Sequence, residues 1–517
     1  MSRFRFSGFQ LAELIAWAAF AVCLRQLFGL FETGALDMLF LFNSDSLFLA
    51  DLIQDLRNGG RLSDWNLTHA VYLLPDLAMW FLVALIAPSL QWTVILFGAL
   101  QAFLAVWLTR ALLVRQYGQP MGGLAPAAYC LVFAFIARGE LTEALDIIKP
   151  IHHFGVALTA LAAFWLLSDW LKTLRWSRLG LLAGMLGVGC FSDPFTLTCV
   201  AVPVVAVLAV AFMRSPIDKK KNLIASLLIV AAAFCGHLGA KMLTDVADEP
   251  GRVRLDGVAG QWAMLRTAVQ TLEFSVPDVI AVLGVIAMPL LLIRGVVRMR
   301  EPDLGATLDI APAVATGANL GALLVTGNVV HVLFNRYQIV IFALLVLTLV
   351  RVAASIQSVW RSRIAAGIIA WSAILVALCA ALSMTHKLWD LPRMSLTSWR
   401  PAATECLVKA ALQHDARRGL GDFWNARLYS SLNAEGLRVE QVDGNGLPDR
   451  WLNTMRPYSM RTPPVAFALV SRLNTVSIEQ TYGAPTTIVS CENEVVWFWD
   501  PPQREMATHA LNALAPK

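Results

Sequence analysis

Residues 43–65 read NSDSLFLADLIQDLRNGGRLSDW and lie between the first long apolar stretch of the chain and the next. Asn43 and Ser44 favour the N-cap of a helix. Apolar side chains then recur at helical spacing, with polar and acidic side chains on the opposite face, and Gly59 and Gly60 end the pattern. The stretch predicts an amphipathic helix that lies along the membrane surface, where an ionisable cluster can meet a lipid-borne substrate.

The composition assigns the chain to the integral membrane proteins. Hydrophobic residues make up 57% of the 517 residues, charged residues 15%, and the mean hydropathy is +0.61. A soluble protein needs a larger share of charged residues to cover its surface. Crossing the hydrocarbon takes roughly 20 apolar residues. We expect an α-helical polytopic protein with about eleven spans, near residues 9–31, 91–109, 122–137, 154–171, 179–192, 195–213, 222–240, 278–297, 307–327, 338–356 and 364–384.

The short basic loops predict the orientation. They alternate along the chain, and basic short loops stay in the cytoplasm, which places the N-terminus inside and the C-terminus outside. This parity requires that residues 71–88, which contain Pro75, Asp76 and Pro88, form a re-entrant or interfacial segment. We expect a bacterial inner membrane protein. The formal net charge of +5 reflects the basic loops and predicts no nucleic-acid partner.

The hydropathy falls from about residue 385 onward. Residues 1–384 form the predicted membrane domain, whose outer loop spans residues 43–75, and residues 385–517 form a predicted α/β domain outside the membrane. In that domain we expect a helical run at 401–418 and strands at 422–430, 437–442, 465–473 and 487–499. Cys406 and Cys491 both lie in this domain, and the sequence leaves two alternatives for them: a disulfide or two buried thiols.

Asp45 has two interpretations. It lies in the first turn of the predicted surface helix, where the helix dipole favours a carboxylate, so it can simply stabilise the helix start. It can also be a general base held close to the membrane surface. The residues alone leave both interpretations open.

Three motifs together resemble one family. They are SDSLFLADLIQDLRNGGRLSDW in the first outer loop, LLAGMLGVGCFSDPFTLTCVAVP at 181–203, which breaks at Ser192-Asp193-Pro194, and VHVLFNRYQIV at 330–340. Together they are similar to the polyprenyl-phosphate-sugar-dependent membrane glycosyltransferases of the GT-C fold. The resemblance covers about the first 385 residues as architecture and only these motifs as residues.

The resemblance implies a reaction. A hexosyl or pentosyl group would pass from a polyprenyl-phosphate donor to a hydroxyl of a glycan, lipid or protein acceptor on the periplasmic face, with inversion. Asp45 would be the general base. Arg336 would bind the donor phosphate through two N–H groups, next to Tyr337 at the outer end of a late span.

Two further groups are candidate site residues. Lys149, His152 and His153 lie together in the loop IIKPIHHF. They are expected either to contact a phosphate or to be ordinary interfacial residues. Adjacent histidines face different ways, so we expect no metal and no other cofactor. The long outer loop 241–278 carries the basic residues Arg252, Arg254 and Arg266, as part of a lid over the substrate or as contacts to anionic membrane lipids.

The alternative function is transport of a lipid-linked sugar or small molecule. A broken helix with intramembrane charges also suits a flippase or permease, and an assembly scaffold is a third class. We interpret Asp193 and Asp76 chiefly as helix caps beside prolines. Glu13 and Arg25, in the first span, are charged residues without an assigned role.

Overall fold

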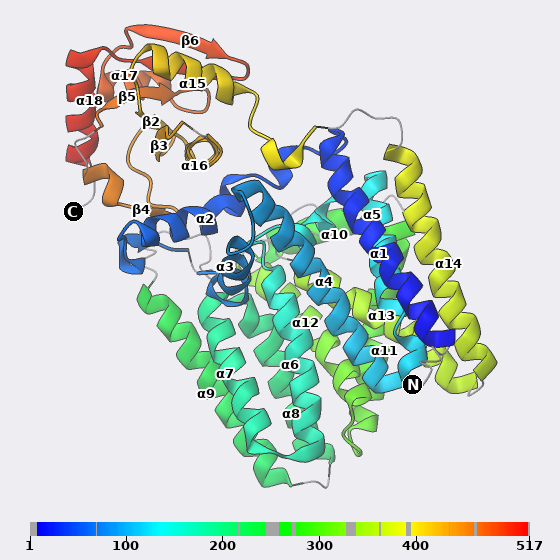
Figure 1. Cartoon of the computed structure of the whole chain (residues 1–517). Coiled ribbons are helices and arrows are strands. Elements are labelled where there is room, and N and C mark those ends of the chain that lie inside the picture. The colour runs from blue at the N-terminus through cyan, green and yellow to red at the C-terminus, as the bar shows by residue number, and fades with distance from the viewer. Residues whose placement is uncertain are drawn as a thin grey trace, which may run out of the picture.

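The computed structural model describes residues 8–514 except 69, 216–217, 244–257, 271–275, 327–337, 361–362, 389–393, 434 and 460–462. It shows a bundle of long helices with a mixed sheet and its helices at one end (Figure 1). We call this end of the bundle the domain end. The N-terminal start of α1 (Gly8–Glu32) lies at the opposite end.

Each of the eleven predicted spans corresponds to a helix. The bundle helices are α1, α4 (Leu90–Tyr117), α5 (Leu124–Arg138), α6 (Phe154–Thr173), α7 (Trp176–Ser192), α8 (Val202–Arg214), α9 (Lys219–Leu243), α11 (Val276–Arg298), α12 (Leu304–Thr326), α13 (Ile339–Trp360) and α14 (Arg363–Leu388). Within the described residues, eight helices are long and apolar enough to cross a membrane by length and composition. The polytopic helical class is therefore confirmed, and the total of eleven spans stays a prediction.

The predicted interruptions are present. Residues 71–88 contain η3 (Leu73–Leu77) and α3 (Ala78–Ala84), and the apolar helix that they form is shorter than a span. The break after α7 falls at Ser192-Asp193-Pro194, where the Asp193 carboxylate accepts a hydrogen bond from the Phe195 amide at 2.9 Å. The chain then continues through η6 (Leu197–Ala201) into α8.

Ion pairs join the helices at the end opposite the domain. Glu13 pairs with Arg110 and so links α1 to α4. Asp309 is fully buried on α12 and accepts hydrogen bonds from Arg294 and Arg351, each with a shortest distance of 2.7 Å. Buried charges need such partners, so the role of Glu13 is structural. Arg25, the other unassigned charge of the first span, pairs with Glu32 at 2.8 Å.

The C-terminal sheet has the strand order β3-β2-β5-β7-β6. The first three of these strands are parallel, and β7 is antiparallel to both of its neighbours. The strands are β2 (Arg418–Gly421), β3 (Arg438–Gln441), β5 (Val465–Leu469), β6 (Thr487–Cys491) and β7 (Glu494–Phe498), and the helices are α15 (Ala403–Gln413), α16 (Phe423–Ser431), α17 (Thr475–Tyr482) and α18 (Pro501–Leu514). The predicted helix at 401–418 and three of the predicted strand regions are present.

The strand predicted at 422–430 is wrong. These residues form α16, which begins after Asp422, whose carboxylate caps the Trp424 amide at 3.3 Å. The aromatic pair Phe423-Trp424 suits a strand by propensity, but the N-cap and the packing of this segment outweigh that preference. The nearest strand is β2, which begins at Arg418, the last residue of the segment 401–418 that was predicted as helix.

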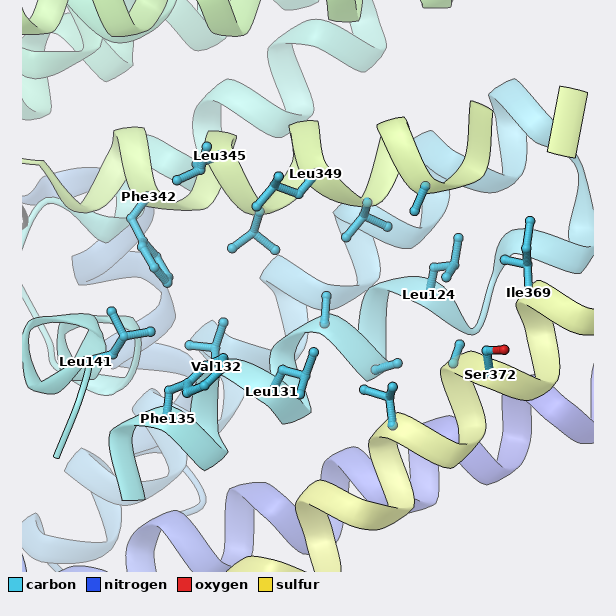
Figure 2. Close-up of a pocket in the computed structure, with 17 residues that line it drawn as sticks. Leu124, Leu131, Val132, Phe135, Leu141, Phe342, Leu345, Leu349, Ile369 and Ser372 are labelled. Carbon is cyan, nitrogen blue, oxygen red and sulfur yellow. The ribbon is translucent and has the colours of Figure 1, made fainter. Parts of the chain in front are cut away.

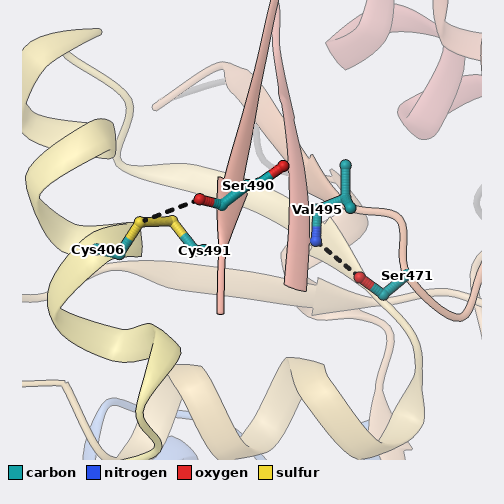
Figure 3. Close-up of a disulfide and its surroundings, with 5 residues drawn as sticks. All are labelled: Cys406, Ser471, Ser490, Cys491 and Val495. Atoms are coloured by element: carbon teal, nitrogen blue, oxygen red, sulfur yellow. Dashed lines mark hydrogen bonds between the residues drawn. A yellow bond between two sulfur atoms is a disulfide. The ribbon is translucent and has the colours of Figure 1, made fainter. Parts of the chain in front are cut away.

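Cys406 and Cys491 form a disulfide (Figure 3). The bridge joins α15 to the end of β6, with a Cα–Cα distance of 5.5 Å. Of the two alternatives for these residues, the bridged one is therefore correct. The bridge closes the domain between its first helix and its outermost strand.

The predicted surface helix is α2 (Ser44–Arg57), and it contacts the C-terminal domain along its acidic face. The Arg427 guanidinium lies 2.8 Å from the Asp51 carboxylate, and Arg456 lies 2.8 Å from Asp55. A two-stranded sheet of β1 (Trp65–Asn66) and β4 (Asn453–Thr454) adds main-chain bonds. The acidic face of α2 therefore binds protein, and the loop that holds α2 and β1 forms one packed unit with the C-terminal domain.

Candidate functional site

The breaks in the helices meet at the domain end of the bundle. The Tyr72 amide donates to the Ser192 carbonyl at 2.9 Å, and the Leu74 amide donates to the Ser192 hydroxyl at 2.8 Å. These bonds hold the turn before α3 against the end of α7. Irregular backbone inside a membrane protein is tolerated where protein buries it or where it lines a cavity, so this junction is a candidate functional site.

His153 and Asp193 form the centre of this junction. His153 Nδ1 lies 2.6 Å from an Asp193 carboxylate oxygen, and its Nε2 lies 3.4 Å from the Tyr72 hydroxyl. Both residues are about 95% buried, and the imidazole packs edge-on against Phe195. His153 has a φ of +62° at the start of α6, a backbone conformation that is uncommon for residues other than glycine. The pairing fixes the imidazole orientation, as a carboxylate does for catalytic histidines.

Asp76 is a second buried carboxyl beside this pair. It lies in η3, outside the eight described helices that are long and apolar enough to cross a membrane, and a carboxylate oxygen stands directly over Gly155, where a Cβ atom would come within 2.3 Å. Burial raises the pKa of Asp76 to about 7, with a further rise from Asp193 and an opposing effect of His153. A carboxyl that titrates near neutral pH suits general acid–base chemistry.

Lys149 lies on the neighbouring loop with a carboxylate of its own. Its ammonium is 2.8 Å from Asp146 and 5.0 Å from the centre of the Phe40 ring. His152 Nδ1 lies 4.0 Å from the same Asp146 oxygen. The three loop residues predicted as a cluster therefore divide, because His153 faces Asp193 while Lys149 and His152 face Asp146.

Gln101 on α4 holds this loop in place. Its side-chain N–H groups donate to the carbonyls of Asp146, Ile147 and Lys149 at 3.3, 2.8 and 3.1 Å. The side chain is fully buried. One amide therefore satisfies three main-chain acceptors that a buried loop would otherwise leave unpaired.

Asp45 lies at the junction of α2 with the C-terminal domain. Asn43 is the N-cap of α2, because its side chain accepts the Ser46 amide at 2.8 Å, so Asp45 is not the capping residue. The Ser44 hydroxyl contacts the carbonyls of Phe423 and Trp424 on α16 at 2.6 and 2.9 Å. Asp45 is half-buried beside this contact, and its role as base stays a prediction.

The remaining predicted site residues divide into two groups. Arg336, Tyr337, Arg252 and Arg254 lie outside the described residues. Arg266 is exposed on α10 (Val258–Gln270). Their proposed roles in phosphate or substrate binding stay predictions. In the part of the chain that the structure describes, no group of three or more His, Cys, Asp or Glu side chains is placed to hold a metal ion.

An apolar cavity of about 490 Å³ opens between α5, α13 and α14. Figure 2 shows Phe135, Leu345 and Leu349 among the side chains that line it, and among the described residues of the lining only Ser372 is polar. Leu141 also lines the cavity and directly precedes η5 (Thr142–Ile148), the turn that leads to Lys149. The cavity and the polar loop are therefore connected through a few residues of chain.

Sequence reasoning missed the pairing of His153 with Asp193 and the burial of Asp76. A signal was present, since each acidic residue stands next to a proline at a helix break, where an apolar chain has no need of a charge. Asp193 does cap the following turn as predicted, but its second oxygen binds the histidine. No family model and no curated protein matches this chain.

Proposed function

We propose that this chain is a membrane glycosyltransferase that moves a sugar from a polyprenyl phosphate to an acceptor hydroxyl. The observation that carries the proposal is the buried cluster of Asp76, His153 and Asp193 at the domain end of the bundle. Charged groups inside a membrane domain are costly unless they act on a substrate or stabilise another group. The three motifs quoted above that resemble the GT-C glycosyltransferases support the same reaction.

The reaction needs a base for the acceptor and cations for the leaving phosphate. Asp45 is the proposed base, because it is half-buried between the bundle and the C-terminal domain, which an acceptor from water can reach. Asp76 is the competing carboxyl, because its pKa lies near neutral pH. Negative charge grows on the leaving phosphate, and Lys149 and Arg336 are the proposed cations.

The apolar cavity supports a lipid-borne donor. A polyprenyl chain is a long flexible hydrocarbon, and almost the whole lining of the cavity is hydrocarbon too. The lining includes Leu141, which is close in sequence to the proposed phosphate contact Lys149. A donor whose tail occupies the cavity would carry its phosphate toward the polar loop.

We further propose a bacterial inner membrane location with the domain end in the periplasm. Arg110, Arg115 and Arg351 lie at the end opposite the domain, as expected for a cytoplasmic face. The disulfide between Cys406 and Cys491 suits an oxidising compartment.

The test is sugar transfer by the full chain in nanodiscs, with radiolabelled polyprenyl-phosphate sugars as donors and membrane glycolipids as acceptors. We expect Asp45→Asn to abolish transfer while donor binding persists, and exposed Glu479→Gln on α17 to leave transfer unchanged. Loss in Asp76→Asn with activity in Asp45→Asn would move the base to Asp76. No transfer from any donor by the wild type would overturn the proposal, and lipid flipping in liposomes would then favour a transporter.

A further inference from the structure

The parallel strands of the C-terminal sheet create a switch point. From β2 the chain passes to β3 on one side and then crosses to β5 on the other, so β2 lies between two strands that follow it in sequence. In open α/β sheets, ligands bind beyond the carboxyl ends of the strands at the point where the strand order reverses. That point is the shared carboxyl edge of β2 and β5.

Two acidic side chains meet at this edge. Asp422 directly follows β2, and Glu494 begins β7, which runs antiparallel beside β5 and so starts at the same edge. The Val495 amide donates to the hydroxyl of Ser471, just beyond β5, at 2.7 Å (Figure 3). The Asn425 side chain donates to Glu494 at 3.1 Å. The edge is therefore a defined polar site on three elements.

Each carboxyl has an oxygen with no hydrogen-bond donor among the described residues. These atoms are Asp422 Oδ1 and Glu494 Oε2, and both are fully buried. The two residues are 9% and 8% exposed. Burial raises the pKa of both carboxyls. The Trp424 amide opposes that rise at Asp422, the Ser471 and Asn425 side chains oppose it at Glu494, and Arg472 opposes it at both. Buried polar oxygens are normally paired, so these two acceptors lack partners that a ligand with donors would supply when the edge opens locally.

The surrounding groups define the chemistry of that ligand. Asn425 and the exposed guanidinium of Arg472 supply donors next to the two acceptors. A group that both donates and accepts, such as a hydroxyl, satisfies this mixture, whereas an ammonium ion would face Arg472. Trp424 follows at once on α16 and is 44% exposed, which offers an aromatic face to the C–H face of a sugar ring.

From these observations we propose that the carboxyl edge formed by Asp422, Asn425 and Glu494 binds a carbohydrate through its hydroxyl groups. Building on the proposed function, this carbohydrate is the acceptor of the transferred sugar. The Ser44 hydroxyl, one residue before Asp45, bonds to the main chain one and two residues after Asp422. The proposed acceptor site and the proposed base are therefore adjacent.

The test measures sugar binding by the full chain in nanodiscs, with saturation-transfer NMR and the methyl glycosides of glucose, galactose, mannose and N-acetylglucosamine as probes. We expect binding of at least one glycoside, weakened about tenfold or more by Asp422→Asn and by Glu494→Gln. Asn is also a good N-cap, so Asp422→Asn keeps α16 in place. Trp424→Ala changes an exposed ring and should weaken binding without a change in folding, whereas Glu479→Gln should leave binding unchanged.

The proposal is overturned if no glycoside binds, or if the folded variants bind it as the wild type does. The proposed function and the carbohydrate site can be tested separately, because each can fail while the other stands. If a glycoside binds through Asp422 and Glu494 but no donor supports transfer, the glycosyltransferase proposal falls and the carbohydrate site stands. If transfer proceeds and the acceptor KM is unchanged in both variants, the carbohydrate site falls and the transferase stands.

Discussion

Arg427 of the C-terminal domain and Asp51 of α2 form an ion pair with an N–O distance of 2.8 Å, although 376 residues separate them in the chain. The guanidinium is 2% exposed and also donates to the Ser44 and Leu452 carbonyls at 2.8 and 2.5 Å. It lies 5.6 Å from the centres of the Phe48 and Phe423 rings. One arginine therefore joins α2 to the C-terminal domain.

Arg427→Ala should release the domain from α2. The substitution removes the donor of the Ser44 and Leu452 carbonyls, and each buried acceptor left without its donor costs about 1–3 kcal/mol. Faster amide hydrogen exchange in both α2 and α16 would show the release. Arg456→Ala is the matched control, because its side chain is 35% exposed where it pairs with Asp55, and such pairs contribute about 0–1 kcal/mol. Equal exchange in the two variants would contradict this role for Arg427.

Breaking the disulfide should destabilise the C-terminal domain. The bridge closes a loop with a sequence separation of 85, and constraint of the unfolded chain over such a loop contributes about 4–5 kcal/mol. Cys406→Ser and Cys491→Ser should lower the denaturation midpoint of the domain by the same amount, as followed by tryptophan fluorescence in denaturant. Reductant should lower the midpoint of the wild type and leave the double variant unchanged. A midpoint unaffected by either substitution would argue against the bridge.

Gly98→Ala should displace the loop that carries Lys149. A Cβ atom at Gly98 would stand 2.3 Å from the Ile148 carbonyl oxygen, and such overpacking costs about 1–3 kcal/mol. Gly184→Ala in α7 is the control, because its Cβ meets no atom of the described residues within 4 Å, and alanine stabilises a helix by about 0.5–1 kcal/mol relative to glycine. Thermal unfolding in nanodiscs should therefore move in opposite directions for the two variants.

The Asp76 carboxyl should make stability depend on pH. Its folded pKa is about 7, above the ordinary value of 3.8, so the folded state holds this proton more tightly than the unfolded state. The contribution of this group to stability therefore falls as pH rises from about 4 to about 7. Asp76→Asn cannot titrate, and its Tm should exceed that of the wild type increasingly toward neutral pH. A Tm difference that does not vary with pH would show that Asp76 does not titrate in this range.

The helices of the membrane part could be predicted because hydrocarbon imposes one solution on a long apolar segment. The bounds of α2 could also be predicted, since Asn43 and Gly59 mark its ends. The partner of the acidic face of α2 could not be predicted, because Asp51 and Arg427 lie far apart in the chain and no local sequence pattern connects them. The same holds for His153 and Asp193, which are 40 residues apart. In the C-terminal domain, local propensity favoured a strand where the cap at Asp422 and the contact with α2 produce α16.

The pairing of β1 with β4 has a consequence for biosynthesis. Trp65 lies opposite Thr454, and Asn66 opposite Asn453, so the loop that holds α2 and β1 leaves the ribosome long before its partner strand exists. During that interval β1 has no partner strand, and the carboxylates of α2 lack the arginines that pair with them in the folded chain. The first loop to be made is thus among the last to reach its final structure, and a nascent chain stalled before residue 453 would present it to proteases and chaperones.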